Sequence, residues 1–124
     1  MREVELKLPA QRSMMLVIRL TTAGVIARAG LGVDRMDDVK MAVEEACSCL
    51  MSDGVSGTLR LRFAREGGQL LIRICADDGC AAPQADPDEL QVEKCILEAL
   101  VDGVTLHVQD ATVRGVELRV AAEA

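Results

Sequence analysis

The stretch DDVKMAVEEACSCLM, residues 37–51, is the segment from which the fold can be worked out. Its apolar side chains recur every three or four residues, which predicts an amphipathic helix capped by Asp34 and ending near Met51. Because a helix turns by about 100° per residue, Glu45 and Cys49 lie side by side next to the apolar face. Cys47 points into that face, about 200° from Cys49, so the two thiols cannot bind one metal ion within a regular helix. The apolar face consists of Met36, Val39, Val43, Ala46, Cys47 and Leu50.

The length and composition of the chain limit the classes of protein to consider. The chain has 124 residues, which predicts a single small domain spanning residues 1–124. Half of the residues are hydrophobic, yet Phe63 is the only aromatic one, so the core consists of aliphatic and sulfur-containing side chains. A net charge of −6 opposes contact with phosphate, and aromatic platforms for single-stranded bases are missing. The composition therefore argues against nucleic-acid binding.

The apolar segments and the cysteines indicate where the protein resides. No segment approaches the roughly 20 apolar residues that span a bilayer. The apolar run at residues 14–18 is stopped by Arg19, so it fails as the core of a signal peptide. The five cysteines are an odd number without regular spacing, which favours reduced thiols over a disulfide framework. These features predict a soluble cytoplasmic protein with no membrane partner.

The remaining elements follow from alternation, helical spacing and turn residues. A strand at 4–8 precedes a helix at 11–29 that stops at Gly30. Strands at 57–66 and 69–78 are joined by Gly67-Gly68 as a hairpin, and a loop follows at 79–86. Asp86 and Pro87 open a third helix that runs to about Val101, and strands at 103–109 and 115–120 close the chain. This order predicts an α/β (α+β) two-layer sandwich, with a mixed, largely antiparallel sheet and helices on one face.

Polar residues on the strands indicate what the uncovered face of the sheet carries. Arg60, Arg62 and Arg73 alternate with apolar residues and form a stripe that Arg119 extends. Such a stripe is either a solvated face or a surface for a partner or a second copy. His107 falls on the same face, and no Ser/His/Asp triad accompanies it. Taken alone, the segment Asp77-Asp78-Gly79 at a strand end is an ordinary turn.

Several of these segments resemble the GHKL (Bergerat-fold, histidine kinase-like) ATPases, and most of all the small bacterial anti-sigma factors that are also serine protein kinases. The signature helix of that family reads Asp-x-x-x-Ala-Val-x-Glu-Ala-Cys-x-Asn, and DVKMAVEEACSC matches it except at the last position. LPAQRSMMLVIRL fits the Pro-led segment and the Arg-containing first helix, and Asp77-Asp78-Gly79 fits the Asp-x-Gly motif. LVDGV and RGVELRV fit the end of the last helix and the terminal strand. The resemblance covers nearly the whole chain and implies the histidine kinase-like ATPase fold.

The resemblance also implies roles for individual residues. Glu45 matches the general base, Asp77 the carboxylate that binds the adenine amino group, and Gly79 the glycine that lets the backbone approach the base. The cofactors of the family are ATP and Mg²⁺, and its chemistry is phosphoryl transfer.

The nucleotide motifs of this chain depart from the family pattern. Cys49 stands in place of the Asn that holds Mg²⁺, although Mg²⁺ prefers oxygen ligands, so no metal is expected. The phosphate-cradling Gly-x-Gly-Leu falls on Gln91, Val92, Glu93 and Lys94, where side chains replace open backbone and Glu93 repels phosphate. Ala81 replaces the second glycine of Asp-x-Gly-x-Gly. The resemblance therefore implies a vestigial nucleotide site, which consists of Asp77, Gly79, Cys49, Gln91, Glu93 and Lys94.

Three functions stay open at this point. The first is an anti-sigma-like regulator with a decayed ATP site, which binds a sigma factor or an anti-anti-sigma (STAS-type) antagonist. The second is an active ATP-binding serine/threonine kinase, in which Glu45 is the general base and Lys94 contacts phosphate. The third is a thiol sensor or soft-metal site formed by Cys49 and Cys80 in the vacated pocket. The resemblance also leaves a homodimer open.

Overall fold

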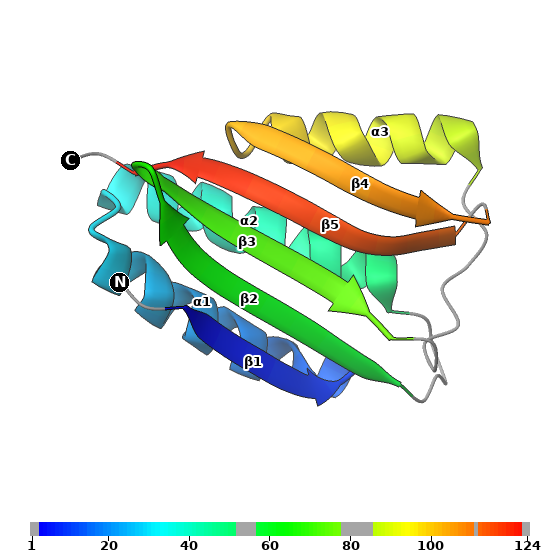
Figure 1. The fold of residues 1–124 in the computed structure, drawn as a ribbon, viewed down its shortest axis with the longest axis horizontal. Helices are drawn as coiled ribbons and strands as arrows, with labels where there is room; N and C mark the ends of the chain where they lie inside the picture. The colour runs from blue at the N-terminus through cyan, green and yellow to red at the C-terminus, as the bar shows by residue number, and fades with distance from the viewer. Residues whose placement is uncertain (1–2, 52–56, 78–85, 111, 123–124) are drawn as a thin grey trace.

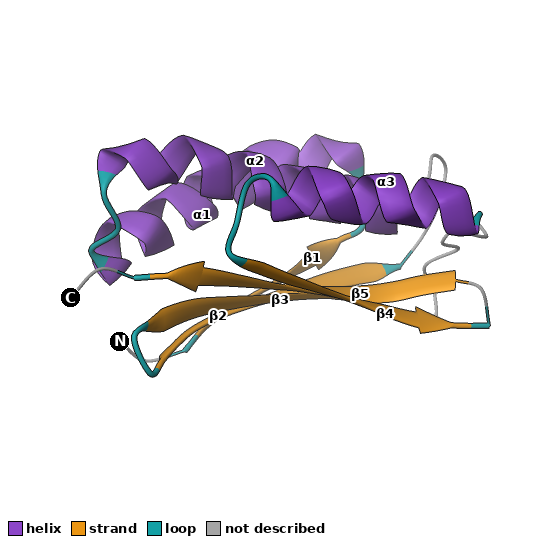
Figure 2. Ribbon diagram, turned by 90° about the horizontal axis from the view of Figure 1, so that it is seen from above, coloured by secondary structure: helices purple, strands orange, loops and turns teal. Residues whose placement is uncertain are grey.

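The protein consists of one antiparallel sheet with helices on one of its faces (Figures 1 and 2). A computed structural model describes residues 3–51, 57–77, 86–110 and 112–122. Within these residues the elements are β1 (Val4–Pro9), a 3-10 turn η1 (Arg12–Met14), α1 (Met15–Ala29), α2 (Val33–Leu50), β2 (Thr58–Glu66), β3 (Gln69–Ala76), α3 (Pro87–Glu98), β4 (Gly103–Gln109) and β5 (Thr112–Ala121). The predicted order of elements and the two-layer architecture are confirmed.

The strands run in the order β1-β2-β3-β5-β4, and each of the described pairings is antiparallel. The β2–β3 hairpin turns at Gly67 and Gly68, whose φ values of 56° and 79° are the positive values that a tight two-residue hairpin requires. The β3–β5 pairing joins Gln69 to Ala121 and so connects the middle of the chain to its end. The turn at Gly67 and Gly68 between β2 and β3 confirms the predicted hairpin.

The core lies between the sheet and the inner face of the helices. On α2 the fully covered residues include Val43 and Cys47, as the helical spacing predicts, whereas Met36 is only partly buried. The inner face of the sheet contributes Leu59, Leu61, Phe63, Ile72, Ile74, Leu118 and Val120. The alternation of apolar and charged residues along β2 and β3 therefore places the arginines outside and the core inside.

Two predicted helix ends differ from the structure. Gly32 is the N-cap residue of α2 and Asp34 lies in the first turn, so the prediction of an Asp34 cap is wrong. An acidic residue in the first turn still interacts favourably with the positive end of the helix dipole, which explains its position without a capping bond. The third helix ends at Glu98 rather than near Val101, and the N–H of Leu100 closes a tighter three-residue turn on the carbonyl of Leu97.

The predicted start of α3 and the predicted stop of α1 agree with the structure. Asp86 caps α3 by accepting a hydrogen bond from the backbone N–H of Asp88 at 2.9 Å, and Pro87 occupies the first turn. Gly30 ends α1 in the left-handed conformation with φ 77°. Of the loop expected at 79–86, only Asp86 lies within the described residues.

The uncovered face of the sheet carries the predicted arginine stripe, and each of its four arginines forms an ion pair with a glutamate. Arg60 meets Glu5 at 3.1 Å, and Arg62 meets Glu3. Arg73 and Arg119 both approach Glu117, each at 3.4 Å. The stripe is therefore a ladder of ion pairs on an exposed surface, where each pair contributes at most about 1 kcal/mol to stability.

No helix in the described part of the chain is long and apolar enough to cross a membrane.

Candidate functional site

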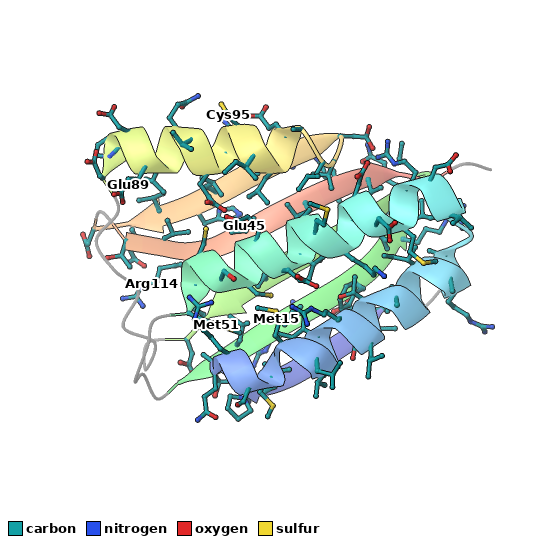
Figure 3. All side chains as sticks on the ribbon, turned by 180° about the vertical axis from the view of Figure 1, so that it is seen from behind. Met15, Glu45, Met51, Glu89, Cys95 and Arg114 are labelled. Carbon is teal, nitrogen blue, oxygen red and sulfur yellow. The ribbon has the colours of Figure 1, made fainter. Side chains whose placement is uncertain are left out.

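The C-terminal half of α2, which carries Glu45 and Cys49, faces α3 rather than open solvent. Glu45 and Cys49 lie on α2, and Glu93 lies on α3, which packs against α2 and β4 (Figure 3). The three side chains interact, since both Glu45 and Glu93 act on the Cys49 thiol and Glu45 and Cys49 both act on the Glu93 carboxyl. The predicted neighbourhood of Glu45 and Cys49 is thus present, and Glu93 joins it.

Burial and the neighbouring acidic groups disfavour the charged forms of Cys49 and Glu93. Burial raises the pKa of the Cys49 thiol, and hydrogen bonding to Glu93 with the negative charges of Glu93 and Glu45 raises it further. Burial also raises the pKa of Glu93, and the nearby carboxyl of Glu45 adds to this, whereas the Cys49 hydrogen bond acts in the opposite direction. Among the described residues, Glu93 Oε1 is buried without a partner of ordinary hydrogen-bond geometry. The cluster is therefore short of hydrogen-bond donors and rich in acidic groups.

These residues are poorly suited to Mg²⁺. A protonated thiol offers the ion a soft and neutral ligand, whereas Mg²⁺ requires hard oxygen ligands in octahedral geometry. In the described part of the chain, no group of three His, Cys, Asp or Glu side chains is arranged to hold a metal ion. Cys47 is fully buried, and burial raises the pKa of its thiol to about 12, so it serves as a core residue.

Asp77 lies apart from the Glu45 cluster. Its carboxylate accepts a hydrogen bond from the backbone N–H of Thr58, and its own N–H donates to the Thr58 carbonyl, both at 3.1 Å. Asp77 therefore closes the end of the β2–β3 pair. It also lines a pocket of about 270 Å³ on the uncovered side of the sheet, with Lys7, Thr58, Arg60, Cys75 and Ala76. Gly79 and Cys80 lie outside the described residues.

The other two predicted nucleotide residues lie on α3 beside Glu93. The Gln91 side chain is exposed, and its amide nitrogen lies 3.8 Å from the Cys95 sulfur. Lys94 is half-buried and forms no ion pair with another described residue. Gln91 and Lys94 thus lie on the same helix as Glu93, the residue that interacts with Cys49, whereas Asp77 lies apart from them.

A second concave surface lies between α1 and α2. It encloses about 390 Å³ and is lined by Arg12, Met15, Arg19, Met41, Glu44, Glu45 and Ser48. Arg19 Nε pairs with Glu44 at 2.5 Å across this α1–α2 groove. Arg12 and Arg19, which are seven residues apart, line the same groove. The Glu44 partner was not predicted, because only the packing of two helices brings residues 25 apart together.

The outer surface of α1 beside the α1–α2 groove is apolar. Leu16 and Leu20 are one helical turn apart and are 61% and 66% exposed. Met41, which lines the groove on α2, is 56% exposed. Large apolar side chains at helical spacing next to a pair of arginines are typical of a surface that binds another protein.

Comparison with known proteins places this geometry in context. No family model matches the sequence. The chain is 35% identical over 80 residues to "Serine-protein kinase RsbW" of Bacillus mycoides (strain KBAB4), a match that covers 62% of this chain and 49% of that protein. It is 36% identical over 80 residues to the protein of the same name in Bacillus subtilis (strain 168), a match that covers 61% of this chain and 49% of that protein. The chain therefore spans about half the length of these relatives.

A solved structure supports the same relationship at the level of the fold. The crystal structure of the RsbU and RsbW domains of a Mycobacterium tuberculosis protein superposes with a TM-score of 0.74, covering 98% of this chain and 32% of that chain at 15% sequence identity. An identity this low bears on the fold alone. Together with the relatives, the fold confirms the predicted resemblance: this chain is similar over 80 residues to proteins named serine-protein kinase RsbW, and it shares its fold with part of the solved structure of RsbU and RsbW domains.

Proposed function

We propose that this chain is a regulatory binding protein of the anti-sigma type whose ATP and Mg²⁺ site has decayed, and that it acts by binding a sigma factor or an anti-anti-sigma (STAS-type) antagonist. The observation that carries the proposal is the contact of Glu93 with Cys49 and Glu45. It brings acidic groups together at the helix position where the resembled kinases hold Mg²⁺ and phosphate.

Electrostatics supports the loss of nucleotide binding. ATP brings several negative charges, and a site for it needs a bound cation or donors that offset them. Glu45 and Glu93 are acidic and supply no positive charge for the phosphates. The Cys49 thiol keeps its proton because its pKa is raised. Lys94 is the nearest cation along α3, and one half-buried ammonium group does not offset two carboxyl groups.

The α1–α2 groove supports the binding role. It is lined by Arg12, Arg19 and Met41 and lies beside the exposed leucines of α1, so this surface offers both charge and apolar area to a partner. Arginine and large apolar side chains contribute most of the binding energy in typical protein interfaces. A partner segment with one acidic side chain and an apolar face fits this surface.

Calorimetric titration with ATP and Mg²⁺ tests the nucleotide part of the proposal. We expect no binding at micromolar concentrations, and no protection from thermal unfolding when the nucleotide is in excess. Micromolar binding would contradict the decayed site and would favour the second candidate, an active serine/threonine kinase with Glu45 as general base. That candidate is favoured by the name of the relatives and by the access of Glu45 to the α1–α2 groove.

Affinity capture from the source bacterium tests the partner. The wild-type chain is expected to retain a sigma factor or a STAS-type protein, identified by mass spectrometry and confirmed by titration with the purified partner. The Arg12→Ala, Arg19→Ala double variant should lose this partner, whereas Arg28→Ala, a cation on the same helix that does not line the groove, should keep it. Equal capture by all three proteins would place the interaction elsewhere. Light scattering of the same samples tests the homodimer.

The third candidate, a thiol sensor at Cys49 and Cys80, is the weakest of the three. The thiolate is the reactive form of cysteine, and the raised pKa of Cys49 disfavours that form. Cys80 lies outside the described residues. Counting free thiols before and after mild oxidation tests this candidate, and it requires the loss of two thiols together.

A further inference from the structure

One register row of the sheet places polar and reactive side chains next to each other on the uncovered face. Lys7 of β1 is opposite Arg60 of β2, and Arg60 is opposite Cys75 of β3. Cys75 is opposite Gly115 of β5, and Gly115 is opposite His107 of β4. The row therefore runs across all the strands of the sheet, with an exposed thiol at its centre.

Gly115 brings Cys75 and His107 together although they lie on strands that are not neighbours. A Cβ atom at Gly115 would lie 3.6 Å from the Cys75 sulfur and 3.7 Å from Cδ2 of His107. Both side chains therefore flank the same point above the glycine, and they leave Gly115 buried although it lies on the uncovered face. Any larger residue at this position would separate the thiol from the imidazole.

The other side of Cys75 borders the pocket of about 270 Å³ that contains Lys7 and Arg60. Arg62 is also close, since the Cys75 charge contributes to its raised pKa after the larger effects of Glu3. The pocket and its surroundings also contain negatively charged side chains. Arg60 is paired with Glu5, and Asp77 lines the pocket, with one carboxylate oxygen accepting from Thr58 N–H.

Lys7 gives the pocket its cationic character. It is exposed, and no ion pair joins it to another residue in the part of the chain that the structure describes. A negatively charged group that enters beside Cys75 can therefore meet an ammonium group without first displacing a carboxylate. The size of the pocket suits a small molecule rather than a protein segment.

We propose that Cys75 is a thiol–disulfide exchange site for small disulfides that carry carboxylates, with Lys7 and Arg60 binding the carboxylates and His107 accepting the thiol proton, directly or through one water. The Cys75 sulfur attacks one sulfur of the disulfide, a bond between the two sulfurs forms, and the disulfide bond breaks. The departing thiolate takes up a proton, so that one mixed disulfide and one free thiol result. This site is independent of the proposed function.

Competing disulfides of opposite charge test the proposal on the intact chain. Oxidised glutathione carries carboxylates, whereas cystamine carries ammonium groups. Cys95 is the matched control, because it is also exposed but lies on α3 among Asp88, Glu89 and Glu98. At low ionic strength, the ratio of the glutathione rate to the cystamine rate should be at least about fivefold higher at Cys75 than at Cys95, because one unshielded charge near 4 Å in water favours the anionic disulfide by about that factor and also disfavours the cationic one. Peptide-resolved mass spectrometry measures the two sites in one sample.

Variants separate the contributions of the cluster. Lys7→Gln combined with Arg60→Gln should bring the ratio at Cys75 close to that at Cys95, and raising the salt concentration should have the same effect on the wild type. His107→Gln should slow both disulfides equally and flatten the pH dependence of the rate. A wild-type ratio equal at the two cysteines, or one that the lysine and arginine variants leave unchanged, overturns the proposal. An unchanged rate and pH profile in His107→Gln overturns the role of the imidazole.

Discussion

Glu45 on α2 and Glu93 on α3 hold their carboxyl groups against each other, with the Cys49 thiol beside them. Two helices in contact are more often joined by opposite charges or by apolar side chains, because like charges in a partly buried site repel. A proton on Glu93, whose pKa is raised, relieves this repulsion. The junction of α2 and α3 is therefore linked to protonation.

This linkage predicts how stability depends on pH. The pKa of Glu93 is raised in the folded protein, so the folded state binds the proton more tightly than the unfolded state. The resulting stabilisation is fully present below the unfolded pKa of about 4.3 and is lost as the pH rises through the higher folded value. Glu93→Gln has no proton to lose, so its free energy of unfolding should fall less than that of the wild type as the pH rises from acidic to neutral. Urea unfolding at a series of pH values measures the difference.

Glu98→Gln is the matched control for this measurement. Glu98 lies on the same helix and is exposed, so its substitution removes the same charge without touching the junction. The control should retain the pH dependence of the wild type. Parallel curves for the wild type and Glu93→Gln would show that the Glu93 proton is not linked to folding.

Restoring the family residues at two positions should restore nucleotide binding. Cys49→Asn supplies an oxygen ligand for Mg²⁺, and Glu93→Gly removes the repelling carboxylate from the middle of α3. We expect the double variant to bind ATP with Mg²⁺ at least about tenfold more tightly than the wild type, which corresponds to about 1.4 kcal/mol. Calorimetry compares the four proteins of the cycle. If the double variant binds no better than the wild type, features other than Cys49 and Glu93 prevent binding.

The attachment of α3 depends on few buried side chains. Leu97 is the only fully covered residue of α3 within its described span, whereas Ile96 beside it is 42% exposed. Leu97→Ala should lower the free energy of unfolding by about 2–5 kcal/mol, because it leaves a cavity under the helix. Ile96→Ala removes a side chain of equal size and should cost less than about 1 kcal/mol. Equal costs for the two variants would contradict the observed packing.

Asp102 joins the end of the last helix to two other elements. Its Oδ2 accepts from Arg35 Nη2 at 2.6 Å and from the backbone N–H of Ala121 at 2.7 Å. Asp102→Ala removes both bonds and leaves Arg35, whose Nε is already buried without a partner among the described residues, so we expect a loss of about 1–3 kcal/mol. Asp102→Asn keeps an acceptor for Ala121 and should cost less. Thermal unfolding of the two variants ranks them.

The sequence predicts the layers of this fold well, because apolar and charged residues that alternate along a strand indicate which side chains are buried. Arg60 and Arg62 alternate with buried Leu59, Leu61 and Phe63, and this alone assigns the two faces of the sheet. Helix ends are predicted less well. Asp34 lies in the first turn of α2 and does not cap the helix, since Gly32 is the N-cap residue.

The site is predictable only where it lies on one element. Glu45 and Cys49 are neighbours through helical spacing, and their proximity follows from the sequence. The contact with Glu93 depends on how α3 lies against α2, and the pairing of Arg19 with Glu44 depends on the α1–α2 contact. The row through Cys75 depends on strand register, which the hairpin fixes for Arg60 but which only the long-range β3–β5 pairing fixes for Gly115.

The β3–β5 pairing also has a consequence for how the chain folds. It joins two local hairpins, β2–β3 and β4–β5, where Gln69 to Cys75 pair with Gly115 to Ala121, whereas β1 pairs with β2 across the two intervening helices. Hairpins close within microseconds, whereas contacts between distant segments must first overcome the entropy of closing a long loop. The two hairpins should therefore form early, whereas the β3–β5 and β1–β2 pairings should form late and set the folding rate.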